Sequence, residues 1–211
     1  EGPHHTARAE VTLDPKQPLV LELRHGSGSL REGGPEVGDR LKRSEAFWSG
    51  WVDGLRLPSV AAWEVVRSAL VLKALCFGPT GAIAAAGTTS LPEHLGGIRN
   101  WDYRYCWLRD AAMAASALVD LGSRDEAMEY LDWVLGVLEE AEAPERLQPL
   151  YTVLGRELGP EAEIAELGGY AGSRPVRVGS AATGQVRLAV WGRTTASGRS
   201  GSRAGTTCIR R

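Results

Sequence analysis

The sequence is poor in cysteine and histidine and has no long run of apolar residues. Its 3 cysteines, Cys76, Cys106 and Cys208, lie far apart and form no CxxC pair, which argues against a disulfide framework or a structural zinc site. We therefore expect no metal or other cofactor, and a reducing, cytoplasmic location. Because a stretch of about 18 apolar residues is also absent, the sequence predicts no transmembrane helix and no membrane partner.

Acidic residues are absent after Glu166, so the charge is divided unevenly along the chain. The whole chain has 24 Lys and Arg against 26 Asp and Glu, a formal net charge of −2. A basic tail can be a nucleic-acid arm, but here no aromatic interleaving or binding fold accompanies the arginines, so we expect no nucleic-acid partner. Residues 189–211 are dominated by Gly, Ser, Thr and Arg, and this composition predicts a disordered tail. A frame-shifted reading of a longer gene would explain the abrupt change of composition.

The first part of the chain predicts two strands, a linker and a helix. Residues 9–13 and 18–25 are short and rich in branched apolar residues, which is typical of strands, and a turn at Asp14-Pro15 separates them. Residues 26–39 form a Gly-rich linker, and residues 39–55 predict a helix. Since two strands alone are marginal in water, their sheet would need further partners.

A long helix is predicted over residues 59–77. Trp63, Val66 and Leu70 follow one another at helical spacing and give one apolar stripe. Ser59 is a suitable N-cap, and Gly78-Pro79 ends the helix.

Two further helices, over residues 108–121 and 123–138, predict an antiparallel hairpin. Gly122 suits the left-handed position after the first helix, and Ser123 with Glu126 forms a capping-box pattern at the start of the second. Successive hairpins of this kind occur in bundles, solenoids and closed helical toroids, and the periodicity does not choose between them.

Unusual residues gather in the segment that joins these helices, residues 78–107. Residues 99–110, RNWDYRYCWLRD, contain four aromatic and five charged side chains at the entrance of a helix. Two interpretations remain open from composition alone: the aromatic residues could fill the core, because Trp and Tyr are large hydrophobes, or they could line a binding site.

A sugar site would use this combination of residue types. A pyranose ring presents an apolar face, which Trp107 and Tyr103 could cover, and a rim of hydroxyls, which Arg109 and Asp110 could bind in bidentate fashion. Asp110 also falls in the first turn of a helix, where the dipole favours a negative charge. The alternative for Arg109 and Asp110 is an ordinary ion pair at the surface, which contributes little.

Residues 80–112 closely resemble the corresponding stretch of bacterial members of glycoside hydrolase family 15, the glucoamylase and trehalase-like enzymes. Three further motifs match in order, at residues 68–75, 147–151 and 169–185. The resemblance implies a mainly α fold, an incomplete (α/α)6 toroid preceded by remnant strands of an N-terminal β-sandwich. The implied organisation is a sandwich remnant with linker at 1–33, a linker helix at 34–58, the first part of the catalytic barrel at 59–188 and the anomalous tail at 189–211.

Carried over by position, the resemblance implies that five residues bind the innermost glucose unit: Tyr103, Trp107, Arg109, Asp110 and Arg174. Ser180 stands where bacterial relatives usually have Asn. Thr88, Thr89 and Glu93 lie in a family motif without an assigned role. In this family a general acid and a general base, two Glu residues, lie beyond the position of Arg211, so we expect no catalytic residue in this chain and no turnover by it.

Several functions follow as hypotheses. The first is a fragment of an inverting hydrolase of α-glucosidic bonds, glucan 1,4-α-glucosidase or glucoamylase-like, with maltooligosaccharides as substrate. The alternatives are an α,α-trehalase-like enzyme acting on trehalose, a module that binds sugar without cleaving it, and a purely structural helical-hairpin protein.

Overall fold

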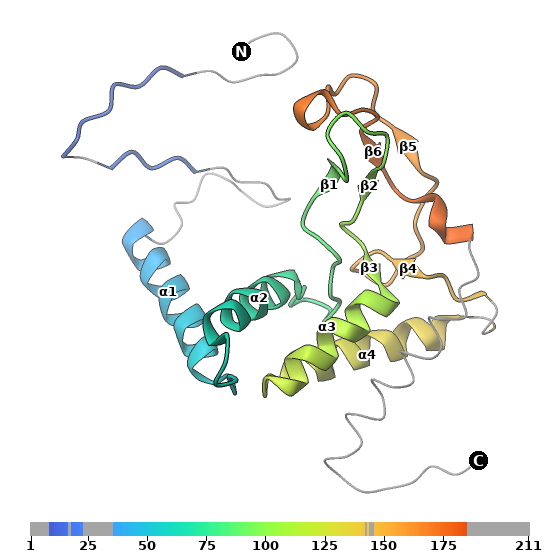
Figure 1. Cartoon of the computed structure of the whole chain (residues 1–211), viewed down its shortest axis with the longest axis horizontal. Coiled ribbons are helices and arrows are strands. Elements are labelled where there is room, and N and C mark those ends of the chain that lie inside the picture. The colour runs from blue at the N-terminus through green and yellow to red at the C-terminus, as the bar shows by residue number, and fades with distance from the viewer. Residues whose placement is uncertain (1–8, 17, 23–35, 142, 144–145, 185–211) are drawn as a thin grey trace, which may run out of the picture. The chain divides into compact units, whose positions relative to one another are not determined.

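The structure is a computed structural model that describes residues 9–16, 18–22, 36–141, 143 and 146–184 (Figure 1). Contacts divide the chain into two units, residues 1–51 and 52–211. Helices predominate, with six short strands among the described residues. The incomplete (α/α)6 toroid and the domain boundaries stay predictions, and the predicted tail at 189–211 lies outside the described residues.

The first unit contains a helix but no strand in the part that is described. Helix α1, Val37–Asp53, begins in this unit and lies two residues from the predicted bounds. The strands predicted at 9–13 and 18–25 are wrong over residues 9–13 and 18–22, which belong to no regular element. The physical reason is that a strand is held by hydrogen bonds to neighbours, and two short apolar stretches alone do not form a stable sheet.

Helix α2, Ala62–Leu75, begins three residues after the predicted N-cap. Its cap position is Ala61, with a φ of 57° and no capping side chain, so the prediction for Ser59 is wrong. The predicted apolar stripe is also wrong at Trp63, which is exposed, whereas Ala69 is buried. Helix α2 contacts α3, and spacing alone could not show which face of α2 would be buried.

Helices α3, Leu108–Asp120, and α4, Asp125–Glu140, form the predicted hairpin. The turn is a Schellman motif: the amide of Ser123 donates to the Leu118 carbonyl and that of Gly122 to the Val119 carbonyl, both at 2.9 Å. Gly122 has a φ of 92°, as its position predicted.

The predicted capping box is wrong in detail. The N-cap residue of α4 is Arg124 rather than Ser123, and the Ser123 hydroxyl donates to the Glu126 carboxylate at 2.5 Å. Glu126 also lies 2.5 Å from the Lys73 Nζ atom of α2, which ties that helix to the hairpin. Burial raises the pKa of Glu126, but the bonds from Lys73 and Ser123 outweigh it and hold the pKa below its usual range.

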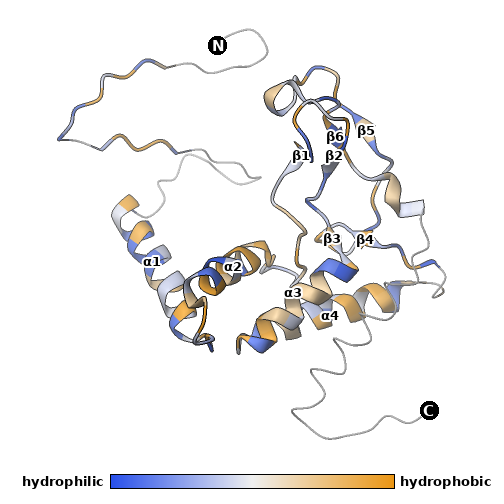
Figure 2. Ribbon diagram, in the orientation of Figure 1, coloured by the Kyte–Doolittle hydropathy of each residue, from blue (hydrophilic) through white to orange (hydrophobic). Residues whose placement is uncertain are grey.

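The core lies between α3, α4 and the strands next to them. Small residues of α3 pack against the large side chains of α4, and apolar residues are frequent along both helices (Figure 2). Its buried members include Leu108, Ala111, Ala112, Ala115, Tyr130, Trp133, Val134, Val137 and Tyr151. Met113, Met128 and Leu135 are exposed on the same two helices.

Short strands lie near the N-terminal end of α3 (Figure 1). Strand β1, Thr89–Pro92, pairs antiparallel with β2, Asn100–Asp102, inside the segment that joins α2 and α3. Strand β3, Cys106–Trp107, pairs with β4, Leu150–Tyr151.

The third strand pair lies near the end of the described residues. Strand β5, Ala162–Glu163, pairs with β6, Arg177–Val178. Two single-turn helices follow β5 and β6, at Tyr170–Gly172 and Ala181–Gly184.

Candidate functional site

A cavity of about 500 Å³ lies at the N-terminal end of α3. Five chain segments contribute to its wall: the stretch before β1, β2, the β3–α3 junction, the residue before β5 and the turn after β6. The lining residues are Ala85, Trp101, Asp102, Tyr103, Trp107, Arg109, Asp110, Glu161, Gly179, Ser180, Ala181 and Ala182.

The junction of β3 and α3 places three of the predicted residues on this wall. Trp107 pairs with Leu150 in the β3–β4 ladder, and the next residue, Leu108, is fully buried and donates its amide to the Pro149 carbonyl at 3.1 Å. With Leu108 anchored in the core, the residues on either side of it, Trp107 and Arg109, both line the cavity.

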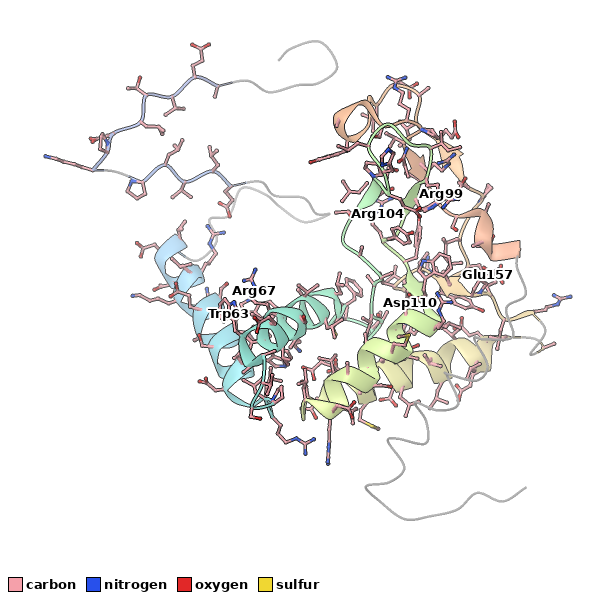
Figure 3. All side chains as sticks on the ribbon, in the orientation of Figure 1. Trp63, Arg67, Arg99, Arg104, Asp110 and Glu157 are labelled. Atoms are coloured by element: carbon pink, nitrogen blue, oxygen red, sulfur yellow. The ribbon has the colours of Figure 1, made fainter. Side chains whose placement is uncertain are left out.

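Asp110 lies at the start of α3, where the helix dipole favours its charge (Figure 3). Its Oδ2 atom is 3.6 Å from the Arg109 Nη2 atom, and both side chains are nearly half exposed. A pair so exposed stabilises the fold little. Both charged groups can therefore rearrange around a ligand at low cost to folding.

Tyr103 is the most open of the aromatic lining residues, with 37% of its surface exposed. Burial raises the pKa of its phenol, and the charges of Glu93 and Asp110 raise it further. The hydroxyl therefore stays protonated at neutral pH and can donate a hydrogen bond.

Asp102 is a buried lining residue that the sequence analysis did not select. Its carboxylate accepts bonds from Arg104 Nε at 2.9 Å and Nη2 at 2.8 Å, and from the Gly179 amide at 3.2 Å. Burial raises its pKa, but these bonds to Arg104 and Gly179 outweigh burial and lower it. Asp102 thus fastens β2 to the turn after β6, which is a structural role.

Gly179 is required at this turn. Its φ is 79°, and a Cβ atom there would lie 2.8 Å from the Pro160 carbonyl oxygen. The close approach brings the Gly179 amide within 3.2 Å of the Tyr105 hydroxyl and sets Ser180 on the cavity wall.

Arg174, the fifth predicted residue, lies elsewhere. It borders a separate groove of about 400 Å³ together with Ile98, Leu167 and Val176, and its Nη1 atom donates to the Ala165 carbonyl at 3.4 Å. The structure therefore brings four of the five predicted residues together and leaves Arg174 outside the cavity.

The residues of the unassigned motif serve the scaffold. The Thr89 hydroxyl donates to the Arg177 carbonyl at 2.6 Å, and the Thr88 carbonyl accepts the Tyr103 amide at 3.4 Å. Glu93 accepts a bond from Trp101 Nε1 at 3.1 Å. These contacts hold the β1–β2 hairpin in place beside the cavity.

Sequence reasoning missed Glu161, which lines the cavity, and Arg177, which forms an ion pair with it. Arg177 is largely buried, with its Nε atom 3.2 Å from Glu161 and its guanidinium 4.9 Å from the centre of the Trp101 ring. The matching motif at residues 169–185 contains Arg177 as well as Arg174, so it was a usable signal, but the choice between its two arginines needed the fold.

Comparison with known proteins assigns the family. Residues 60–190 match glycosyl hydrolases family 15, and the chain belongs to this family. A trehalase of Mycolicibacterium smegmatis is 37% identical over 190 residues, which cover 88% of this chain and 28% of that protein. Trehalase 1 of Sulfolobus acidocaldarius is 44% identical over 143 residues, covering 67% of this chain and 25% of the relative.

A trehalase of Mycobacterium tuberculosis is 41% identical over 161 residues, covering 74% of this chain and 23% of that protein. The chain thus spans about a quarter of the length of the curated relatives it matches. No solved structure matches the chain.

No group of three or more His, Cys, Asp and Glu side chains within the described residues could hold a metal ion. Over the same ranges, every helix is too short or too polar to cross a membrane.

Proposed function

We propose that the cavity at the start of α3 binds one glucose unit, and that the longer protein of which this chain forms a part hydrolyses an α-glucosidic bond with inversion. The observation that carries this is the convergence of Tyr103 and Trp107 with Arg109 and Asp110 on one open cavity. A purely structural role would require these side chains to fill a closed interior, whereas Tyr103 and Asp110 are exposed.

The shape and chemistry of the cavity suit a sugar. Its volume of about 500 Å³ falls in the range of small-molecule sites, roughly 300–1,000 Å³. Two aromatic rings supply apolar surface for the ring face, while a guanidinium and a carboxylate supply donors and acceptors for adjacent hydroxyls.

Trehalose is the favoured substrate. The first hypothesis from the sequence was a glucoamylase, but the three relatives described above are all named trehalase. We therefore place α,α-trehalose ahead of maltooligosaccharides. Hydrolysis would release two glucose molecules, one of which would occupy the cavity described here.

Chemistry needs carboxyl groups beyond those of this cavity. An inverting glycosidase uses an acid and a base about 6.5–9.5 Å apart, with a water between the base and the sugar. We assign Asp110 to binding, Asp102 to the scaffold and Glu161 to the ion pair with Arg177, and so propose that the 211 residues alone bind sugar without cleaving it. Incubation with trehalose and with maltose, followed by glucose detection, tests this; cleavage that Arg109→Ala abolishes would contradict it.

Binding is tested by titrating the chain with glucose, trehalose and a glucose-shaped iminosugar, followed by calorimetry and by tryptophan fluorescence. Trp107→Ala should weaken binding at least about tenfold, since loss of an aromatic surface removes on the order of 1–3 kcal/mol. Trp63→Ala is the matched control, because Trp63 is exposed on α2 and does not line the cavity. Equal affinities for the two variants, or no binding by the unaltered chain, would refute the proposal.

A further inference from the structure

Glu161 contributes a carboxylate to the cavity wall. The family resemblance assigns it no role, and it is not part of the Arg109–Asp110 pair. It precedes β5, far in sequence from the β3–α3 junction, and its side chain is 23% exposed. A partly buried carboxylate at the wall of a cavity needs a physical reason, because burying a charge is costly unless partners hold it.

Two partners hold this carboxylate in place. Its Oε1 atom lies 3.2 Å from Arg177 Nε, and its Oε2 atom accepts the Ala181 amide at 3.3 Å. Arg177 is itself fixed, because its Nη1 atom donates to the Ile98 carbonyl at 2.7 Å and its guanidinium lies over Trp101. The carboxylate is therefore preorganised, which reduces the entropy lost when a ligand binds.

Acceptor capacity remains after both partners are counted. A carboxylate offers about four lone-pair sites, and the Ala181 amide occupies one of them on Oε2, whereas the Arg177 contact is an ion pair. A hydroxyl of a ligand in the cavity can donate to one of the sites left over.

We propose that Glu161 is a second sugar-binding carboxylate, which accepts hydrogen bonds from hydroxyls of the bound glucose unit, and that Arg177 is the residue that positions it. The inference rests on the proposed function of the cavity. It assigns the wall formed by Glu161 and the turn after β6 to sugar recognition, in addition to the wall formed by the β3–α3 junction.

Glu163 provides a matched control within the same ion-pair cluster. Its Oε1 atom lies 3.4 Å from Arg177 Nη2, yet its side chain is 60% exposed and does not line the cavity. If the ion pairs of Arg177 matter only for folding, neutralising either glutamate should have a similar effect on binding. If Glu161 touches the sugar, only its variant should weaken binding.

The experiment measures the affinity of the 211-residue chain for glucose and for trehalose by calorimetry, together with the thermal melt of each variant. Glu161→Gln should bind both sugars about tenfold more weakly, as expected for loss of a hydrogen bond to a charged group, while Glu163→Gln should stay within about twofold of the unaltered chain. Glu161→Asp keeps the charge beside Arg177 but withdraws it by one methylene, so it should also weaken binding and serves if the Gln variant does not fold.

Each remaining outcome counts against the proposal. Glu161 variants that fold and bind like the unaltered chain, or equal losses for Glu161→Gln and Glu163→Gln, overturn it while leaving the proposed function intact, provided that Trp107→Ala loses binding. If the unaltered chain binds neither sugar, the proposed function fails and this inference fails with it.

Discussion

Two sets of aromatic side chains meet at the β3–β4 ladder and have opposite surroundings. The core aromatics, Tyr130, Trp133 and Tyr151, are buried and contact one another, with ring centres 6.0 Å apart for the first pair and 6.5 Å for the second. The cavity aromatics, Trp101, Tyr103 and Trp107, are partly exposed and line an open space.

The comparison shows what decides the role of an aromatic residue. Tyr130 donates its hydroxyl to the Leu108 carbonyl at 2.9 Å, so its polar end is satisfied inside the core, and burial raises its pKa. Leu108 is the neighbour of Trp107 in the chain. Two consecutive residues at the start of α3 thus have opposite roles: Leu108 fills the core, and Trp107 faces the cavity.

Replacing a core aromatic should have the largest effect. We expect Trp133→Ala to lower the free energy of unfolding by about 3–5 kcal/mol, because it leaves a cavity among Tyr130, Val137 and Tyr151. Urea unfolding at neutral pH, followed by circular dichroism, measures this. Trp107→Ala is the comparison variant and should lose much less stability. Equal losses would show that Trp107 belongs to the core, which removes the distinction between the two sets.

Replacing Asp102 should give the next largest loss of stability, because this residue fastens β2 to the turn after β6 beside the cavity aromatics. Asp102→Asn removes a buried carboxylate that Arg104 and Gly179 hold, and should cost about 1–3 kcal/mol at neutral pH. Since the folded-state pKa is below the ordinary value of 3.8, the stabilisation is complete above that value and is lost as the pH falls through the lower folded pKa.

The stability difference between Asp102→Asn and the unaltered chain should therefore be constant near neutral pH and shrink below about pH 3.8. Urea titrations over that range test it. Glu93→Gln is the control, since the Arg99–Glu93 pair is exposed at 3.5 Å and should contribute less than about 1 kcal/mol, while the Gln side-chain oxygen can still accept the bond from Trp101. A difference that persists unchanged into acid would mean that the charge of Asp102 does not carry the effect.

Sequence periodicity predicted the hairpin well because its signals are local. Gly122 needs a left-handed conformation and takes it, and Tyr130, Val134 and Val137 repeat at helical spacing and are buried. Local signals could not predict which face of α2 is buried, or that residues 9–13 form no strand. Both depend on which partners lie next to the segment.

The same limit applies to the site. Trp107, Arg109 and Asp110 are close in sequence, so their composition was visible at once. Glu161 and Gly179 reach the cavity only through the β5–β6 pairing and the contact with Asp102, which join segments far apart in the chain. Long-range pairing of this kind leaves no periodic signal in either segment.

The smallest expected effect distinguishes the two arginines that resemblance had grouped together. Arg109 lines the cavity with Trp107, whereas Arg174 borders the separate groove. Arg109→Ala should therefore weaken glucose binding about tenfold, and Arg174→Ala should change it by less than about twofold. Calorimetry on both variants measures this directly. A loss at Arg174 as large as that at Arg109 would mean that the groove and the cavity act as one site when sugar binds, and that the wall between them, which includes Glu161 and Arg177, moves on binding.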